Sequence, residues 1–435
     1  MTHPVFYETS YRMEILSNAS DLVSRIRPDS RVFVHGAAAT PTRLLDAICE
    51  RALAEKTFRG IELVGLHTMG EARYASEAFH DQIRVSAFFL GENLRRLYRP
   101  GFVDYVPAFL SEIPALFRSG RFPIDVAIVQ VSPPDKEGFC TLGTSVDIAC
   151  AAVEQAGLVL AQINSRMPRV LGDGRIHTRD IDFAILADDP LPVCHLESQS
   201  PEVMRLGRKV AEMIEDGSTL QMGIGSVPDA VLAALTSHRN LGIHTEMWSD
   251  GALALIRSGV VDNSKKVTHP GKTVSTFFMG SEDLYRFIDG NPSVLALDAS
   301  IVNSPGEIAK NPKVVAINSA VEIDLTGQVC ADSIGSRIIS GTGGQMDFVR
   351  GASLSKGGKP IIALQSRTRR GESRIVSCLK SGAGVVTTRA HVHFVATEYG
   401  VVDLYGKNLD QRAKALIGIA HPGDREGLSR SWRER

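Results

Sequence analysis

The stretch Asp216-Gly-Ser-Thr-Leu-Gln-Met-Gly-Ile-Gly-Ser-Val-Pro-Asp-Ala-Val-Leu-Ala-Ala-Leu235 contains the pattern that decides the fold. An apolar run ends at Met222, a glycine-rich turn follows, and helical spacing extends from Pro228 to Ser237. A strand, a tight turn and a helix in this order form the repeating unit of α/β proteins. Proline fits near the start of a helix, because the first N–H groups there have no helical partner.

The same pattern occurs earlier in the chain. Asp29–Ile48 can be laid over Asp216–Leu235 without a gap, at an offset of 187 residues. Further along, Leu66-His67-Thr68 resembles Ile243-His244-Thr245. Two aspartate–glycine turns also match, at Asp135-x-x-Gly138 and Asp324-x-x-Gly327. Three matches in the same order predict two copies of one α/β domain that face each other, with a ligand cleft between them.

Short runs rich in valine, isoleucine and alanine occur in both halves. They include Arg31–His35, Asp125–Val131, Val314–Asn318 and Pro360–Leu364. Such runs are typical of strands buried on both faces of a mainly parallel sheet. Helical spacing at Asp46–Lys56 alternates with them. The sequence therefore predicts the α/β class, with two similar open domains.

A proline-rich segment without periodicity, Asp188–Pro201, separates the two halves. Clusters of proline and small polar residues between periodic segments are typical of linkers. We expect an N-terminal domain at 1–190 and a C-terminal domain at 191–435, the second carrying the candidate catalytic glutamate.

Composition excludes several classes of protein. The 435 residues are 43% hydrophobic and 22% charged, enough to bury a large core. The net charge of -1 gives no basic excess for nucleic acid. No apolar run approaches the length of a membrane span. Met1-Thr2-His3-Pro4 lacks a leader pattern, and the six scattered cysteines favour a reducing, cytoplasmic compartment.

The glycine-rich turn at Gly223–Val227 is a candidate binding loop. Glycine lets the backbone approach a ligand, and the helix start offers N–H groups to an anion. An ordinary strand–helix turn is the plainer interpretation. A dinucleotide fingerprint is a rival, because Glu246 lies where a ribose-binding acid would be. Pro228, at the position of the third glycine, argues against that rival.

Glu246 is the candidate nucleophile. It ends a short apolar run and is followed by Met247 and Trp248. Apolar neighbours remove water from a carboxylate, which raises its energy and its nucleophilicity. A surface acid at a strand end is the plainer alternative. Asp250 is the competing carboxylate, but Ser-Asp-Gly is better interpreted as a turn.

A second glycine-rich segment, Ser340–Gly351, contains three glycines in four residues. Successive backbone N–H groups can bind an oxyanion or a phosphate. Gln345 adds an amide group, and Phe348 and Val349 indicate that the segment is packed. Lys359 follows shortly afterwards and is equally a candidate phosphate contact and an ordinary turn lysine.

His391 and His393 would share one face of a strand, as metal ligands can. No third ligand follows at a recognisable spacing, so we favour packing or substrate positioning and expect no metal.

Together these residues resemble the acetyl-CoA hydrolase/transferase family, especially the 4-hydroxybutyrate, butyrate and acetate CoA-transferases. The resemblance spans nearly the whole chain. The segments that carry it are Gly223–Ala230, Gly242–Met247, Ser340–Phe348, Ala396–Gly400 and Ala415–Pro422. It implies two similar open α/β domains with the active site between them.

The resemblance also implies roles for individual residues. Glu246 would be the nucleophile, forming a glutamyl-CoA thioester in ping-pong catalysis, and Gln345 a catalytic helper. Coenzyme A, a substrate here and not a tightly bound cofactor, would contact a larger set. That set is Gly223, Ile224, Gly225, Ser226, Val227, Gly343, Gly344 and Lys359. Ser226 departs from the family, which often has glycine at that position.

The acid partner stays open at this point. Acetate, butyrate and 4-hydroxybutyrate are candidates, as are dicarboxylates such as succinate or itaconate. A dicarboxylate would need a cation in the acyl pocket, for which Arg43, Arg73 and Arg389 are possible sources. An acyl-CoA hydrolase, a non-catalytic CoA or nucleotide sensor and a dinucleotide oxidoreductase are the alternatives. We expect a homo-oligomer, without nucleic-acid or membrane partners.

Overall fold

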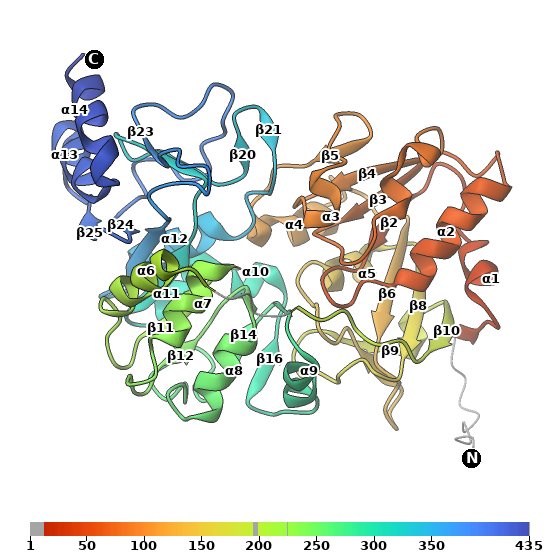
Figure 1. The fold of residues 1–435 in the computed structure, drawn as a ribbon. Helices are drawn as coiled ribbons and strands as arrows, with labels where there is room; N and C mark the ends of the chain where they lie inside the picture. The colour runs from red at the N-terminus through yellow and green to blue at the C-terminus, as the bar shows by residue number, and fades with distance from the viewer. Residues whose placement is uncertain (1–12, 195–198, 224, 435) are drawn as a thin grey trace.

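The computed structural model describes residues 13–194, 199–223 and 225–434. The first half is built on an eight-stranded sheet in which every neighbouring pair is parallel. Its order is β1 (Glu14–Ile15), β10 (Phe183–Ala187), β8 (Leu158–Asn164), β6 (Val126–Val131), β2 (Arg31–Val34), β3 (Ile61–Gly65), β4 (Ile83–Ala87) and β5 (Val103–Tyr105). Figure 1 shows this sheet in red to yellow.

The second half is built on a six-stranded sheet. Its order is β12 (Gly242–Ile243), β11 (Thr219–Met222), β17 (Val314–Asn318), β22 (Lys359–Ala363), β24 (Phe394–Thr397) and β25 (Gly400–Asp403). Only the last pair is antiparallel. Parallel strands require crossover connections, which agrees with the alternation of strands and helices in the sequence.

Five strands of each sheet share one topology, which confirms the predicted duplication. In chain order, β2, β3, β6, β8 and β10 correspond to β11, β12, β17, β22 and β24. In space, the order β10-β8-β6-β2-β3 matches the order β24-β22-β17-β11-β12. The predicted class, two similar open α/β domains with mainly parallel sheets, is therefore correct.

The repeated aspartate–glycine turns are alike at the level of single hydrogen bonds. Asp135 Oδ1 accepts from the backbone N–H groups of Glu137 and Phe139. Asp324 Oδ1 accepts from those of Thr326 and Gln328 in the same pattern. One turn chemistry has therefore been kept in both copies.

The helices begin and end slightly differently from the prediction. Helix α2 spans Thr42–Ala54 and starts four residues before the predicted Asp46, whereas α7 spans Ser226–Ala233 and starts two residues before the predicted Pro228. The other helices are α1 (Ala19–Val23), α3 (Glu92–Arg95), α4 (Ile113–Arg118), α5 (Ala149–Gln155), α6 (Pro201–Ala211), α8 (Asp250–Arg257), α9 (Glu282–Ile288), α10 (Ala299–Val302), α11 (Pro305–Lys310), α12 (Gln345–Leu354), α13 (Leu409–Ile419) and α14 (Arg425–Arg433).

Short strands build the loops around the two sheets. They are β7 (Phe139–Thr141), β9 (Arg175–His177), β13 (Met247–Trp248), β14 (Thr273–Ser275), β15 (Phe277–Phe278), β16 (Val294–Ala296), β18 (Glu322–Asp324), β19 (Val329–Cys330), β20 (Ser333–Ile334), β21 (Arg337–Ile338) and β23 (Ile375–Val376). The described part of the predicted linker contains no helix or strand before α6. The division at 190/191 stays a prediction.

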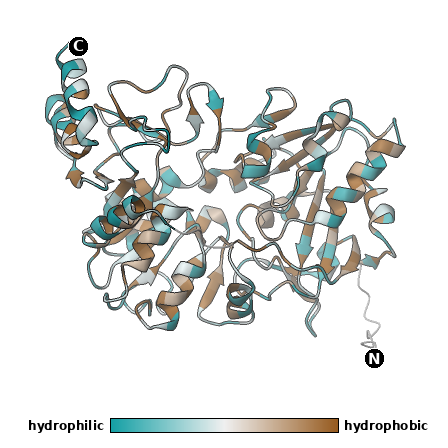
Figure 2. Ribbon diagram, viewed as in Figure 1, coloured by the Kyte–Doolittle hydropathy of each residue, from teal (hydrophilic) through white to brown (hydrophobic). Residues whose placement is uncertain are grey.

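Backbone hydrogen bonds join the two halves beside the candidate nucleophile. Val146 N–H donates to Thr276 O, and Ala299 N–H donates to Asp147 O. One hydrophobic cluster contains residues of both halves, including Val129 and Ile317. Figure 2 shows brown, hydrophobic strands inside helices that present teal faces outward. The halves therefore share one hydrophobic cluster, with loops of both meeting at the interface.

Candidate active site

Glu246 lies in the short connection between β12 and β13, beyond the carboxyl end of a parallel strand. Its backbone oxygen accepts hydrogen bonds from the N–H groups of Thr276 and Phe277. The hydroxyl of Ser275 donates to the same oxygen at 2.9 Å. Ligands bind at this edge of open α/β sheets, and these contacts fix the main chain that carries the glutamate.

Two donors hold the carboxylate of Glu246. Asn303 Nδ2, at the end of α10, lies 2.9 Å from Glu246 Oε2. The backbone N–H of Gly344 also donates to this carboxylate. Gly344 is the N-cap residue of α12, so the carboxylate faces a helix start, where negative charge is favoured.

The approach of the glycine loop to Glu246 excludes a side chain at Gly344. A Cβ built there would lie 1.9 Å from Glu246 Oε2 and 2.2 Å from Asn303 Nδ2. Gly343 has φ +54°, a left-handed conformation that glycine adopts without cost. The predicted pair Gly343–Gly344 therefore lies against the predicted nucleophile.

Burial raises the pKa of Glu246 from about 4.5 to about 7. The hydrogen bond from Asn303 opposes this shift, whereas the negative charges of Asp347 and Asp147 add to it. The N–H of Gly344 lowers the pKa slightly. A carboxylate that is costly to ionise but still ionised near neutral pH is suited to nucleophilic attack.

A cavity of about 190 Å³ opens beside Glu246. Its lining includes residues of both halves and contains four of the predicted site residues besides Glu246, which are Gly223, Gly343, Gly344 and Gln345. The remaining lining residues are Phe89, Gln221, Met222, Met247, Asn318, Ser319, Ala331, Ser340, Gly341 and Thr342. None of these described lining residues is an arginine or a lysine.

Residues of the first glycine loop line two different hollows. Gly223 faces the cavity, and Gly225 caps α7 with φ +124°. Ser226 lines a neighbouring, larger hollow of about 520 Å³, which also contains Arg367 and Arg369. Val227 is buried in the hydrophobic core. Ile224 lies outside the described residues.

Gln345 is the first residue of α12 and is nearly buried. Its side-chain nitrogen donates to Ser319 O at 2.9 Å, and the hydroxyl of Thr387 lies 3.4 Å from its oxygen. The amide is therefore fixed at the cavity wall, with one N–H not used by the contact to Ser319.

The structure does not bring Lys359 to the cavity. Its ammonium group donates to Met213 O at 2.8 Å and to Glu215 Oε1 at 2.9 Å. Lys359 begins β22, whereas the cavity lies beyond the carboxyl ends of β11 and β17. Lys359 and Glu246 therefore lie at opposite ends of the sheet's strands, and the contacts of Lys359 are structural.

Sequence reasoning missed Asn303 and the residues that clamp the second glycine loop. Tyr105, from the first half, accepts a hydrogen bond at its hydroxyl oxygen from Thr342 N–H at 2.8 Å. Leu110 N–H donates to Gly343 O. Asn303 carried no signal, since an asparagine before Ser-Pro is ordinary turn chemistry. These contacts depend on docking of the halves, which no local pattern describes.

The other polar candidates have structural surroundings. His391 Nδ1 lies 3.0 Å from Thr388 Oγ1, and the ring of His393 packs on Tyr405. Both precede β24, so they are not on a strand as expected. Asp250 begins α8 and accepts from Ser281, so the turn interpretation was wrong. No group of described residues could hold a metal ion.

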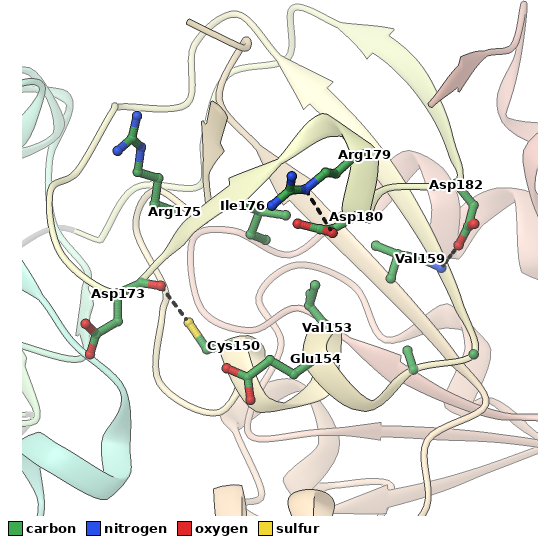
Figure 3. Close-up of a pocket in the computed structure, with 12 residues that line it drawn as sticks. Cys150, Val153, Glu154, Val159, Asp173, Arg175, Ile176, Arg179, Asp180 and Asp182 are labelled. Carbon is green, nitrogen blue, oxygen red and sulfur yellow. Dashed lines mark hydrogen bonds and ion pairs between the residues drawn. The ribbon is translucent and has the colours of Figure 1, made fainter. Parts of the chain in front are cut away.

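Another hollow, of about 480 Å³, lies on the first half (Figure 3). Its polar groups mostly contact one another or the backbone. Cys150 Sγ donates to Asp173 O at 3.2 Å, and Asp182 Oδ2 accepts from Val159 N–H at 2.9 Å. The surroundings of Glu246 differ, because there a buried carboxylate faces hydrogen-bond donors and a cavity.

Comparison with known proteins agrees with this geometry. Residues 4–197 match the acetyl-CoA hydrolase/transferase N-terminal domain, and residues 280–432 match the acetyl-CoA hydrolase/transferase C-terminal domain. The chain belongs to this family and is a CoA-transferase. No helix in the described part of the chain is long and apolar enough to cross a membrane.

The chain is similar to several named transferases. A succinyl-CoA:acetate/propanoyl-CoA:succinate CoA transferase of Fasciola hepatica is 48% identical, over 96% of this chain and 88% of that protein. A 4-hydroxybutyrate coenzyme A transferase of Clostridium kluyveri is 46% identical, over 99% of each chain. The crystal structure of a 4-hydroxybutyrate CoA-transferase from Porphyromonas gingivalis superposes with a TM-score of 0.83 at 37% identity, over 97% of each chain.

Proposed function

We propose that this enzyme moves coenzyme A between short-chain acids through a thioester on Glu246. The observation that carries this proposal is the buried carboxylate between Asn303 and Gly344. A carboxylate oxygen attacks the acyl-CoA carbonyl carbon, the C–S bond breaks, and the thiolate leaves with the electron pair. The thiolate then attacks the glutamyl carbonyl of the anhydride, which releases the first acid as its carboxylate.

The acceptor acid reverses these steps, so no water, metal or redox cofactor enters the balance. Each tetrahedral intermediate carries an oxyanion. The side-chain N–H of Asn303 and the backbone N–H of Gly344 are the donors proposed to stabilise it at the glutamyl carbon. One such donor is worth about 3–4 kcal/mol in the transition state. Gln345 is proposed to assist from the cavity wall through its second N–H.

Coenzyme A is proposed to lie along the first glycine loop. Gly223 lines the cavity beside Glu246 and Ser226 lines the neighbouring polar hollow, so a coenzyme lying along this loop would reach both. The thiol end of the coenzyme is proposed to lie in the cavity beside Glu246, next to Gly343 and Gly344. Contacts of the remote parts of the coenzyme would supply binding energy for the reacting centre. Lys359 is left out, because Glu215 and Met213 hold it elsewhere.

The acid partner is proposed to be a monocarboxylate, such as acetate, butyrate or 4-hydroxybutyrate. A second carboxylate in a desolvated cavity needs a cation, and no described residue lining this cavity supplies one. Arg43 is paired with Asp189 and Arg73 with Glu50, both at exposed positions. Arg389 is not among the lining residues. Succinate and itaconate are therefore expected to be poorer acceptors.

An acceptor screen tests the proposal. Acetyl-CoA is the donor, and butyrate, 4-hydroxybutyrate, succinate and itaconate are supplied at equal concentration. New acyl-CoA and free thiol are measured together. Transfer to the monocarboxylates with little free thiol supports the proposal. Equal thiol release with and without acid would indicate a hydrolase, and preference for succinate would contradict the monocarboxylate assignment. A cytoplasmic location and a homo-oligomer stay predictions.

A further inference from the structure

A second carboxylate lies next to the nucleophile and is not used by the proposed chemistry. Asp347, in the first turn of α12, is 4% exposed. Asn303 Nδ2 is 2.9 Å from Glu246 Oε2 and 3.4 Å from Asp347 Oδ2. One amide group therefore separates two carboxylates in a buried site, where like charges repel strongly.

The first half of the molecule holds Asp347 in place. Ser111, in the short helix η3 (Leu110–Glu112), donates twice to it. Its hydroxyl lies 2.7 Å from Asp347 Oδ1, and its backbone nitrogen lies 3.1 Å from Asp347 Oδ2. Burial raises the pKa of Asp347 to about 6, and these two donors oppose that rise, so the carboxylate is ionised at neutral pH. No arginine, lysine or histidine hydrogen-bonds to this carboxylate among the described contacts.

The thioester removes one of the two charges. The ionised, reactive form of Glu246 carries a negative charge, but the glutamyl thioester is neutral, and the lost charge leaves with the released acid. Repulsion from Asp347 therefore raises the energy of the free carboxylate and not that of the thioester. An interaction that disfavours the starting state in this way drives the step forward.

We propose that Asp347 is a positioning residue that acts on Glu246 through Asn303, and that its charge favours conversion of Glu246 to the neutral thioester. This inference rests on the proposed function. The inference also gives the first half of the molecule a role, because Ser111 of that half stabilises the charged form of Asp347. Docking of the halves and activation of the nucleophile are thereby linked.

The other charged groups around Asp347 do not replace it. Glu112 is exposed and is the one charged residue of η3, and its negative charge adds to the rise in the pKa of Asp347. Arg118 of α4 pairs with Asp298, just before α10, and Lys310 pairs with Glu307 on α11. On its own helix Arg350 lies one turn further along. Asp147 also contributes negative charge at Glu246, beside His67, and would remain in a variant of Asp347.

The test measures the thioester equilibrium in the full-length enzyme. Enzyme is mixed with acetyl-CoA and acetate at fixed ratios, quenched in acid, and the fraction carrying covalent coenzyme A is read by mass spectrometry. Asp347→Asn is expected to lower the equilibrium constant for the thioester by about tenfold or more. Glu112→Gln removes a nearby but solvent-exposed charge and is the matched control, with little change expected at pH 8.5, where Asp347 is ionised in both proteins.

Ser111→Ala provides a second variant with a distinct readout. Loss of one donor makes Asp347 easier to protonate. The thioester fraction of the Ser111→Ala enzyme is therefore expected to fall below that of the wild type near pH 6 and to return to the wild-type value near pH 8.5. An unchanged equilibrium in folded Asp347→Asn overturns the inference. If Asp347→Asn does not fold, a thioester fraction in Ser111→Ala that is reduced equally at every pH also overturns the inference. Absence of any thioester in the wild type would instead refute the proposed function.

Discussion

Asn303 Nδ2 lies 2.9 Å from Glu246 Oε2, although 57 residues separate the two along the chain. The asparagine ends helix α10, whose first N–H donates to Asp147 of the other half. The position of the donor is therefore determined by docking of the halves. The nitrogen that holds the resting carboxylate is also the donor proposed to hold the oxyanion after attack, which would need no reorganisation at the moment of reaction.

Replacing Asn303 by alanine is expected to lower kcat by about a hundredfold to a thousandfold, because one oxyanion donor is lost. The KM for acetyl-CoA should change little, since the proposed coenzyme contacts lie on the glycine loops. Steady-state kinetics with butyrate as acceptor measure both. A change confined to KM would mean that Asn303 binds substrate and does not stabilise the transition state.

Gly344→Ala is expected to abolish most activity, because its Cβ would lie 1.9 Å from Glu246 Oε2 and force the carboxylate or the loop to move. Misplacement of a reacting group by about 1 Å costs about a hundredfold in rate. Gly427→Ala, on α14 with nothing within 4 Å of its Cβ, is the matched control and should keep wild-type kinetics. Wild-type turnover in Gly344→Ala would refute the close approach.

The pH dependence of kcat/KM should report Glu246. Its pKa is raised to about 7, and only the ionised form is a nucleophile, so the rate should rise with pH through about 7 and then level off. The carboxylic acid substrates are ionised throughout this range. A profile measured with saturating acceptor that shows no inflection between about pH 5 and 9 would contradict this assignment.

The raised pKa of Glu246 also predicts how the stability of the variant Glu246→Gln depends on pH. The native state keeps the proton of Glu246 up to about pH 7, whereas the unfolded chain loses it near pH 4.5. Wild-type stability from this group therefore falls as pH rises from 4.5 to 7, by about 3 kcal/mol in all. Glu246→Gln should be more stable than the wild type at pH 8 by about this amount, and nearly equal to it at pH 4.

Urea unfolding at the two pH values measures the difference. Glu112→Gln, which removes an exposed carboxylate, is the comparison and should change stability little at either pH. An equal gain for Glu246→Gln at pH 4 and at pH 8 would show that the gain does not come from the ionisation of Glu246.

Much of the fold could be predicted because the local patterns agree with the tertiary structure. Val314–Asn318 is a strand with the predicted bounds, and the offset between Asp29–Ile48 and Asp216–Leu235 reflects a shared topology. Buried parallel strands leave an unambiguous apolar run. The duplication could be found because each copy needs the same strand–turn–helix unit.

The candidate site was less accessible to sequence reasoning. Gly344 could be selected because glycine repeats are visible, but the reason for it, contact with Glu246, is not local. Lys359 was selected as a possible phosphate contact and through the family resemblance, but it begins its strand, at the opposite end from the cavity. Asn303, Ser111 and Tyr105 depend on how the two halves dock, so no spacing in the chain indicates them.

Trapping of the covalent intermediate tests the central proposal most directly. Enzyme is incubated with acetyl-CoA without acceptor, treated with borohydride or hydroxylamine, digested and analysed by mass spectrometry. The proposal predicts one modified peptide, with the change on Glu246, and less of it when excess butyrate is added before the reagent. Modification of a different residue, or full transfer activity in Glu246→Ala, would contradict it.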